Sequence, residues 1–386
     1  MPLRLALCAA AALALVSAPA AGAALPAKPR GWPGRVELGL ADQPGGAAGL
    51  RSAAPLGFRY QYLAGGVNTG SGWSTWNPAG TFVTRYVRES RGAHVAPVFT
   101  YYMLLQSKPG GGGELEADLR NLRTRDTMRA WYRDLALFLR RAGAFRSTRI
   151  VLHVEPDLWG YLQQRARSDR ASSIPAAVSS TGLPSLRGLP NNASGLARAV
   201  VRLRDRLAPN VLLGYHVSVW GTGVDISLQN PPARQVDRLA ARAATFMRSL
   251  HARFDLSFAE FDDRDSGFNE KILGDGGASR WNSADFSRHI RFLAGYVRVA
   301  RTRMVLWQIP LGNSRLSDTW GRYRDNRVEW LLDGPPYEHV RAYARAGTIA
   351  LLFGGGADGT TSAKTDGGLF VNRAQAYYRA GGVPVR

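Results

Sequence analysis

The chain has 386 residues, of which 50 are Lys or Arg and 29 are Asp or Glu, giving a formal net charge of +21. Such a charge favours polyanionic partners, but 46 of the basic residues are Arg spread along the whole chain, and no basic run or nucleic-acid-binding motif stands out. We therefore expect no nucleic-acid partner. The length is sufficient for a large core in one big domain or two ordinary ones.

The amino-terminal end has the pattern of a secretory signal peptide. Arg4 precedes an apolar stretch from Leu5 to Val16, and the small residues Ala21-Gly22-Ala23 form a cleavage site. We expect residues 1–23 to be removed and the mature protein to be secreted, to the medium or the cell envelope. No other apolar run is long enough to span a bilayer, so no membrane insertion is expected. The single cysteine, Cys8, lies in the signal peptide, which excludes disulfide chemistry in the mature chain.

Apolar runs of strand length alternate with helical patterns along the chain. The predicted strands are 36–41, 58–63, 95–103, 150–155, 211–219, 255–261, 304–309 and 348–353, and the clearest helices are 124–141, 194–207, 233–253, 283–301 and 336–346. This alternation requires right-handed crossovers and a parallel sheet. No Gly-rich phosphate fingerprint follows the first strand, so we predict a single (β/α)8, TIM-like barrel over residues 24–386. Residues 44–55 are rich in Gly and Ala, and a seven-stranded or irregular barrel is the alternative.

One predicted strand ends in acidic and aromatic residues, in the sequence Arg149-Ile-Val-Leu-His-Val-Glu-Pro-Asp-Leu-Trp-Gly-Tyr161. The apolar run suits a strand covered on both faces, so carboxylates at its tip face solvent or ligand. Strand alternation places His153, Glu155 and Asp157 on one face. Paired carboxylates beside aromatic rings suit a site that cleaves sugars, because acids move protons and rings stack on sugar faces. The alternative is that Asp157 only caps the following helix.

A second acidic group follows the strand 255–261, in the sequence Ser257-Phe-Ala-Glu-Phe-Asp-Asp-Arg-Asp265. Glu260 and Asp262 share a strand face. Like charges across a barrel mouth raise the pKa of one carboxyl group, which a general acid needs near neutral pH. The alternative is a cluster of salt bridges with Arg264.

Aromatic and amide side chains gather at or just beyond the predicted strand ends. Aromatic rings there suit a sugar cleft, and amides suit sugar hydroxyls, although packing at the barrel rim explains any single ring equally well. The candidate substrate-binding residues from this pattern are Trp73, Trp76, Tyr101, Trp159, Trp220 and Gln308.

Three segments, 149–158, 210–221 and 352–362, resemble in their order the family 6 glycoside hydrolases, the cellobiohydrolases and endoglucanases. The similarity covers roughly residues 128–366. It implies that Asp157 is the general acid and that Asp358 is the family's late aspartate, while His216 does not align cleanly with the family histidine. We add His216 and Asp358 to the substrate-binding candidates. The family's Asp-Arg-Asp-Cys type segment is replaced by Thr-Tyr-Tyr-Met-Leu-Leu-Gln-Ser at 100–107.

An alternative assignment makes Glu155 the general acid, by its similarity to the Asn-Glu-Pro motif of retaining barrel glycosidases. That assignment requires a second Glu on the seventh strand, where this chain has Gln308.

The sequence thus predicts a secreted glycoside hydrolase that cleaves O-glycosidic bonds of a polysaccharide or oligosaccharide. Asp157 would protonate the leaving oxygen, with Glu155 or a nearby acid raising its pKa, and Glu260 or Asp262 would activate water or stabilise the oxocarbenium charge. The resemblance to an inverting family favours inversion. We expect no cofactor: His153, Glu155 and Asp262 are candidate metal ligands, but the His-x-His start of barrel metallohydrolases is absent.

Two alternatives belong to other functional classes. A barrel that has lost its catalytic pair would serve as a secreted carbohydrate- or wall-binding protein. A metal-dependent hydrolase, such as a phosphoesterase or deacetylase, would lose activity on chelation. Fold analogy does not choose among these, because barrels host many chemistries.

Overall fold

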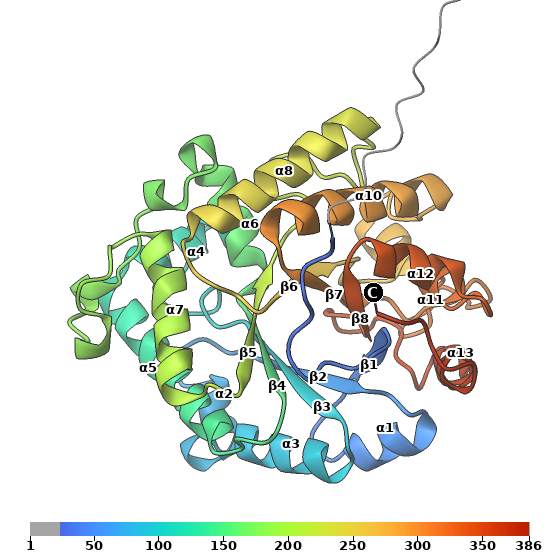
Figure 1. The fold of residues 1–386 in the computed structure, drawn as a ribbon, viewed down its shortest axis with the longest axis horizontal. Helices are drawn as coiled ribbons and strands as arrows, with labels where there is room; N and C mark the ends of the chain where they lie inside the picture. Colours follow the sequence, from blue (N-terminus) through green and yellow to red (C-terminus); the bar gives the residue numbers. More distant parts are fainter. Residues whose placement is uncertain (1–23, 386) are drawn as a thin grey trace, which may run out of the picture.

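A computed structural model describes residues 24–385, and the expected signal peptide, residues 1–23, lies outside the described residues. The strands are all parallel and close into a barrel in sequence order, with β8 paired to β1 and helices around the outside (Figure 1). This confirms the predicted (β/α)8 barrel and excludes the seven-stranded alternative. The strands are β1 Glu37–Ala41, β2 Phe58–Leu63, β3 Ala96–Tyr101, β4 Ile150–Val154, β5 Val211–His216, β6 Leu256–Glu260, β7 Arg303–Ile309 and β8 Thr348–Phe353.

Helices follow the strands as the sequence pattern predicted, with ends that differ by a few residues. Even the Gly- and Ala-rich segment after β1 contains a short helix. The helices are α1 Ala47–Ala53, α2 Trp73–Trp76, α3 Thr81–Gly92, α4 Glu114–Arg123, α5 Arg125–Gly143, α6 Pro156–Arg165, α7 Ala193–Leu207, α8 Ala233–Ser249, α9 Ser266–Phe268, α10 Ser283–Ala300, α11 Arg327–Leu331, α12 Glu338–Arg345 and α13 Leu369–Arg379.

The strands bury both of their faces, which explains their continuous apolar runs. One buried cluster, which includes Phe58, Phe258 and Trp307, fills the barrel interior, and a larger one lies between the strands and the helices. Gly214 of β5 leaves room for this interior packing, because a Cβ added there would lie 2.3 Å from the ring of Phe258. Trp32 closes the amino-terminal end of the barrel: it stacks on Phe58 at a centroid distance of 4.9 Å, and its indole N–H donates to the carbonyl of Ile349.

The connections differ in length between the two ends of the barrel. At the amino-terminal ends of the strands the links are short, such as residues 208–210 before β5 and 301–302 before β7. At the carboxyl ends they are long, such as residues 217–232 after β5 and 310–326 after β7. The long connections supply most of the material for a site at the carboxyl-terminal face, where barrel enzymes carry their active sites.

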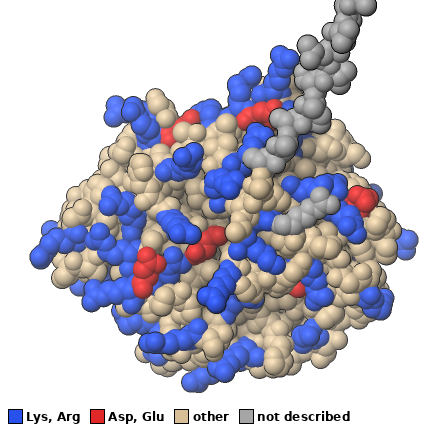
Figure 2. Space-filling model, in the orientation of Figure 1, with Lys and Arg blue, Asp and Glu red and all other residues tan. Residues whose placement is uncertain are grey.

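Basic side chains are frequent on the face of the molecule seen in Figure 2. Figure 2 shows Lys and Arg distributed over the whole face in view, with few acidic residues among them. Among residues 24–385, no helix combines the length and the apolar character that crossing a membrane requires.

Candidate active site

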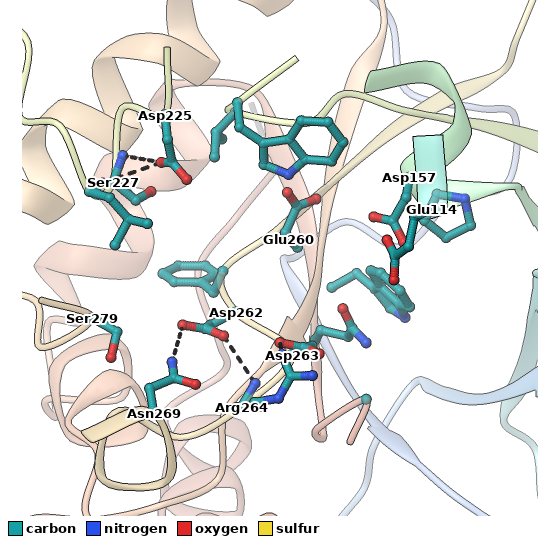
Figure 3. Close-up of a pocket in the computed structure, with 18 of the residues that line it drawn as sticks. Glu114, Asp157, Asp225, Ser227, Glu260, Asp262, Asp263, Arg264, Asn269 and Ser279 are labelled. Carbon is teal, nitrogen blue, oxygen red and sulfur yellow. Dashed lines mark hydrogen bonds and ion pairs between the residues drawn. The ribbon is translucent and has the colours of Figure 1, made fainter. Parts of the chain in front are cut away.

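A cavity of about 800 Å3 lies at the carboxyl-terminal ends of the strands (Figure 3). Each strand from β2 to β8 contributes a lining residue, either from its own end or from the segment that follows it. The volume falls within the range of small-ligand sites, about 300–1,000 Å3. The position and the size together make this cavity the candidate active site.

Carboxylates dominate the lining of the cavity. We call the following residues the acidic lining: Glu114, Asp157, Asp225, Glu260, Asp262, Asp263 and Asp275. Arg264 is the only Lys or Arg among the residues that line the cavity, and it forms an ion pair with Asp263 at 2.5 Å. In Figure 3, Asp157 and Glu114 lie on one side, Asp225 and Asp262 on the other, and Glu260 between them.

Asp157 lies in the first turn of α6, just beyond the end of β4. Burial, and after it the carboxylates of Glu260 and Glu114, raise the pKa of Asp157 to about 6, while His216 and a hydrogen bond from the Tyr102 hydroxyl oppose the shift. A carboxyl group that keeps its proton near pH 6 is suited to general-acid catalysis.

Glu260, the last residue of β6, is held from below by a pair of buried histidines. One oxygen of its carboxylate contacts Nε2 of His216, and Nδ1 of His216 lies 2.9 Å from Nε2 of His153. Nδ1 of His153 lies 3.4 Å from the hydroxyl of Thr100, so the chain of contacts ends in the barrel wall. Burial and the neighbouring His216 lower the pKa of His153 well below its usual value, so His153 is neutral. The other oxygen of Glu260, Oε1, has no partner within the described chain.

Asp262 also faces the cavity but is bound to its own loop. Its carboxylate accepts hydrogen bonds from the backbone N–H of Arg264 at 3.1 Å and from the side-chain amide of Asn269 at 2.9 Å. Burial raises the pKa of Asp262 to about 7, and the positive charge of Arg327 opposes this shift. These contacts fix the loop after β6, so Asp262 is less free than Glu260 to act on a ligand.

Glu155 does not lie beside Asp157, contrary to the expectation from strand alternation. Its backbone is left-handed, with φ +43°, which turns its side chain away from the cavity. The buried carboxylate accepts hydrogen bonds from the backbone N–H groups of Met103 and Leu104 and from the indole of Trp131 at 2.6 Å. Burial raises the pKa of Glu155 to about 8, although these donors favour its charged form. Glu155 therefore ties the loop after β3 to the end of β4.

Three of the candidate substrate-binding aromatic residues belong to the core. Trp73 and Tyr101 are fully buried, and both donate to the carboxylate of Asp134 at 2.7 Å. Trp159 is also fully buried, and its indole donates to the carbonyl of Val154. These residues follow strand ends in the chain, but their side chains point into the layer between strands and helices.

The remaining substrate-binding candidates divide between the cavity and the rest of the structure. Trp220 and Gln308 line the cavity, with Trp220 packed against Tyr161 at a centroid distance of 4.9 Å. Trp76 and Asp358 are exposed and do not line it. His216 is fully buried below Glu260, so its contact is with the carboxylate and not with a ligand.

Several lining residues were not among the substrate-binding candidates, although Trp307, near the end of β7, belongs to the aromatic residues that gather at the predicted strand ends. The sequence could have identified Tyr62 as a lining residue, because it lies near the end of β2 on the same strand face as Tyr60. Trp307 packs against Tyr62 at 5.7 Å and against His153 at 4.7 Å, and it separates the histidine pair from the cavity. Glu114, Asp275 and Trp281 come from helix starts and long loops, where no sequence pattern marks them.

The candidate metal ligands do not form a site. Glu155 faces the loop after β3, His153 lies inside the barrel, and Asp262 binds its own loop. Over residues 24–385, no group of three or more His, Cys, Asp or Glu side chains has an arrangement that would hold a metal ion.

Comparison with known proteins finds solved structures whose fold is similar to that of this chain. No family model and no curated protein matches the sequence. Solved structures with a similar fold include the GH6 enzyme of Orpinomyces sp. Y102, at 12% identity over 81% of this chain and 84% of that one, with a TM-score of 0.37. Endoglucanase CEL6B from Humicola insolens is 13% identical over 90% and 97% of the two chains, with a TM-score of 0.40.

A third similar structure is PbGH5A, a glycoside hydrolase family 5 enzyme from Prevotella bryantii B14. It is 9% identical over 89% of this chain and 88% of that one, with a TM-score of 0.43. By name, these three structures are a GH6 enzyme, an endoglucanase and a glycoside hydrolase family 5 enzyme. At these identities the likeness is one of fold alone, so the function has to be argued from the site.

Proposed function

We propose that the protein is a secreted glycoside hydrolase acting on a polysaccharide or oligosaccharide, with Asp157 and Glu260 as its catalytic pair. The observation that carries the proposal is the contrast between these two carboxyl groups in one cavity. Burial raises the pKa of Asp157 to about 6, whereas Glu260 contacts His216 through one carboxylate oxygen and leaves the other, Oε1, without a partner in the described chain. A carboxyl group with a raised pKa and a second carboxylate facing the same cavity are the two groups that glycoside hydrolysis requires.

In the proposed reaction, Asp157 gives its proton to the glycosidic oxygen as the bond from that oxygen to the anomeric carbon breaks. Glu260 takes a proton from a water molecule, whose oxygen forms the new bond to the anomeric carbon. Glu260 then releases its proton to solvent and Asp157 takes one up from solvent, which restores the starting state. This course inverts the anomeric configuration, the outcome in the family that the motifs resemble.

The remaining lining suits a sugar. Aromatic rings from Tyr62, Tyr161 and Trp220 offer apolar faces to pyranose rings, and Gln308 offers an amide to hydroxyl groups. No metal ion or cofactor has a role in this scheme.

A hydrolysis screen tests the proposal. Mature protein, Asp157→Asn and Glu260→Gln are incubated with a panel of polysaccharides and oligosaccharides, and new reducing ends are measured. The expected result is release of sugars by the wild type and a loss of about 10²–10⁴-fold in each variant. Matched controls are Asp126→Asn and Glu338→Gln, which change exposed acids that do not line the cavity. Release that survives both catalytic substitutions would overturn the assignment, and NMR of the first-formed anomer tests inversion.

A further inference from the structure

The acidic lining contrasts with the rest of the protein. The chain carries 50 basic and 29 acidic residues, and its Arg residues are spread along the whole sequence. Acids outside the cavity are commonly paired with Arg, as in Arg242–Asp169, Arg291–Asp237 and Arg204–Asp255. Seven of the 29 acids nevertheless line one cavity that contains a single Arg.

Most of the acidic lining lacks a protein cation. Within residues 24–385, Asp263 is its one member that forms an ion pair with Lys or Arg. Glu260 contacts His216, and other members accept hydrogen bonds from uncharged groups, for example Asp225 from the backbone N–H groups of Ser227 and Leu228, and Glu114 from the hydroxyl of Tyr161 at 2.6 Å. The cavity therefore presents carboxylates to whatever enters it.

These carboxylates are close enough to repel one another. Glu260 raises the pKa of Asp157, of Asp225 and of Asp263, in each case after the larger effect of burial. A cleft lined by one sign of charge concentrates ligands of the opposite sign, and a bound cation relieves the repulsion among its walls. The electrostatics of the cavity thus favour a positively charged ligand over a neutral or anionic one.

Two further observations point to an organic ligand that carries hydroxyl groups. The indole N–H of Trp307, a lining residue that is only 3% exposed, has no hydrogen-bond partner in the described chain and needs an acceptor. Oε1 of Glu260 is also buried without a partner and needs a donor. The aromatic side chains between the acids offer faces both to sugar rings and to ammonium groups. A metal ion would give the Trp307 N–H no acceptor, and the cavity is far larger than an ion.

We propose that the substrate is a cationic glycan, a polymer or oligomer of hexosamine whose amino groups are free and protonated. The aromatic rings bind the sugar faces, Trp307 and Glu260 bind hydroxyl groups, and the acidic lining binds the ammonium groups. The proposal deepens the proposed function, since cleavage of this glycan rests on the catalytic pair Asp157 and Glu260, whereas its binding rests on the whole lining of the cavity.

Matched pairs of oligosaccharides test the proposal. Oligomers of glucosamine and of galactosamine are compared with the same oligomers after N-acetylation, which removes the charge and keeps the sugar and the linkage. Binding to the Glu260→Gln variant is measured by calorimetry at mildly acid pH, in low and in high salt. We expect the free-amine member of at least one pair to bind about tenfold tighter or more, and this advantage to shrink in high salt.

Asp225 provides the matched variant, because it belongs to the acidic lining but not to the catalytic pair. In the Glu260→Gln background, Asp225→Asn should weaken binding of the free-amine oligomer several-fold and leave binding of its N-acetylated partner unchanged. Asp126→Asn, which changes an exposed acid on α5, should alter neither. Thermal unfolding of each variant confirms that it is folded.

The outcomes separate the two proposals. Selective binding and cleavage of a free-amine oligomer support both. Selective binding without cleavage by the wild type supports the cationic ligand and contradicts the hydrolase. Cleavage of neutral or N-acetylated glycans with no preference for free amines supports the hydrolase and overturns the cationic ligand, as does equal binding of both members of every pair.

Discussion

His216 contacts Glu260 from inside the barrel, while its other ring nitrogen lies 2.9 Å from His153. Because an ionised carboxylate only accepts, His216 donates to Glu260, and the neutral His153 and Thr100 complete the chain of contacts behind it. His153 stacks on Phe258 at a centroid distance of 4.1 Å, and this stacking fixes the plane of the His153 ring. The orientation of the proposed base thus depends on buried groups that touch no ligand.

Replacing His216 by Ala should therefore lower kcat by about 10²-fold, the usual cost of misplacing a reacting group by about 1 Å, with little change in KM. His216→Gln, whose amide keeps a donor, should recover part of the loss. The measurement is the separate determination of kcat and KM on a glycan found in the hydrolysis screen. Equal losses in the Ala and Gln variants, or a loss confined to KM, would contradict a positioning role.

The pH dependence of activity should show Asp157 directly. Its pKa is raised to about 6, and a general acid works in its protonated form, so kcat/KM should fall as the pH rises through about 6. In Asp157→Asn this alkaline limb should disappear together with most of the activity. Substrates whose leaving groups need no proton should lose far less. A fall that persists in the variant would show that another group titrates.

Glu155 and Asp157 should behave in opposite ways, although they are two residues apart. Glu155→Ala leaves the N–H groups of Met103, Leu104 and Trp131 buried without an acceptor, so the free energy of unfolding should fall by about 2–5 kcal/mol. Asp157→Asn should change it by less than about 1 kcal/mol, because Asp157 is already penalised by burial. Urea unfolding of the two variants makes the comparison. A stable but inactive Glu155→Ala would restore Glu155 as the candidate acid.

Two tryptophans provide a similar contrast between binding and folding. Trp220→Ala should weaken glycan binding by about 1–3 kcal/mol, the value of burying a large apolar side chain, and should leave the protein folded. Trp73→Ala should instead lower the free energy of unfolding by about 3–5 kcal/mol, because Trp73 is fully buried. Calorimetric binding and thermal unfolding of both variants give the answer. Unchanged binding in Trp220→Ala would make that ring part of the barrel rim only.

Export should leave a defined amino terminus. The Arg4, apolar core and Ala21-Gly22-Ala23 pattern predicts that the exported protein begins at or near Ala24. Mass spectrometry of protein recovered from outside the producing cell checks this. An exported chain that retains Met1 would contradict it.

The barrel was predictable because strand and helix patterns alternate along the whole chain, and each buried strand is a continuous apolar run. Asp157 and Glu260 were also predictable, since carboxylates at the carboxyl ends of parallel strands converge on one face. Glu155 was not, because the left-handed backbone that turns it away depends on contacts with Met103 and Trp131, which are distant in the chain.

The aromatic residues show a second limit of the sequence. A position just after a strand places a ring near the rim of the barrel. It does not determine whether the ring points into the cavity or into the layer of helices. Trp220 turns inward, whereas Trp159 turns into the layer of helices and bonds to Val154. Glu114 and Asp275 reach the cavity from segments whose paths are set by tertiary contacts, so no local pattern could have identified them.

The tryptophan at the opposite end of the barrel has a consequence for proton exchange. Trp32 is 4% exposed and stacks on Phe58, so the barrel interior is closed on the amino-terminal side. His153 and His216 lie in that interior and are themselves fully buried. We expect isotope exchange at their ring nitrogens to proceed by way of Glu260, which contacts His216 and lines the cavity, and a ligand seated over Glu260 should slow it. The imidazole N–H resonances of the two histidines would therefore report occupancy of the cavity without any substrate being turned over.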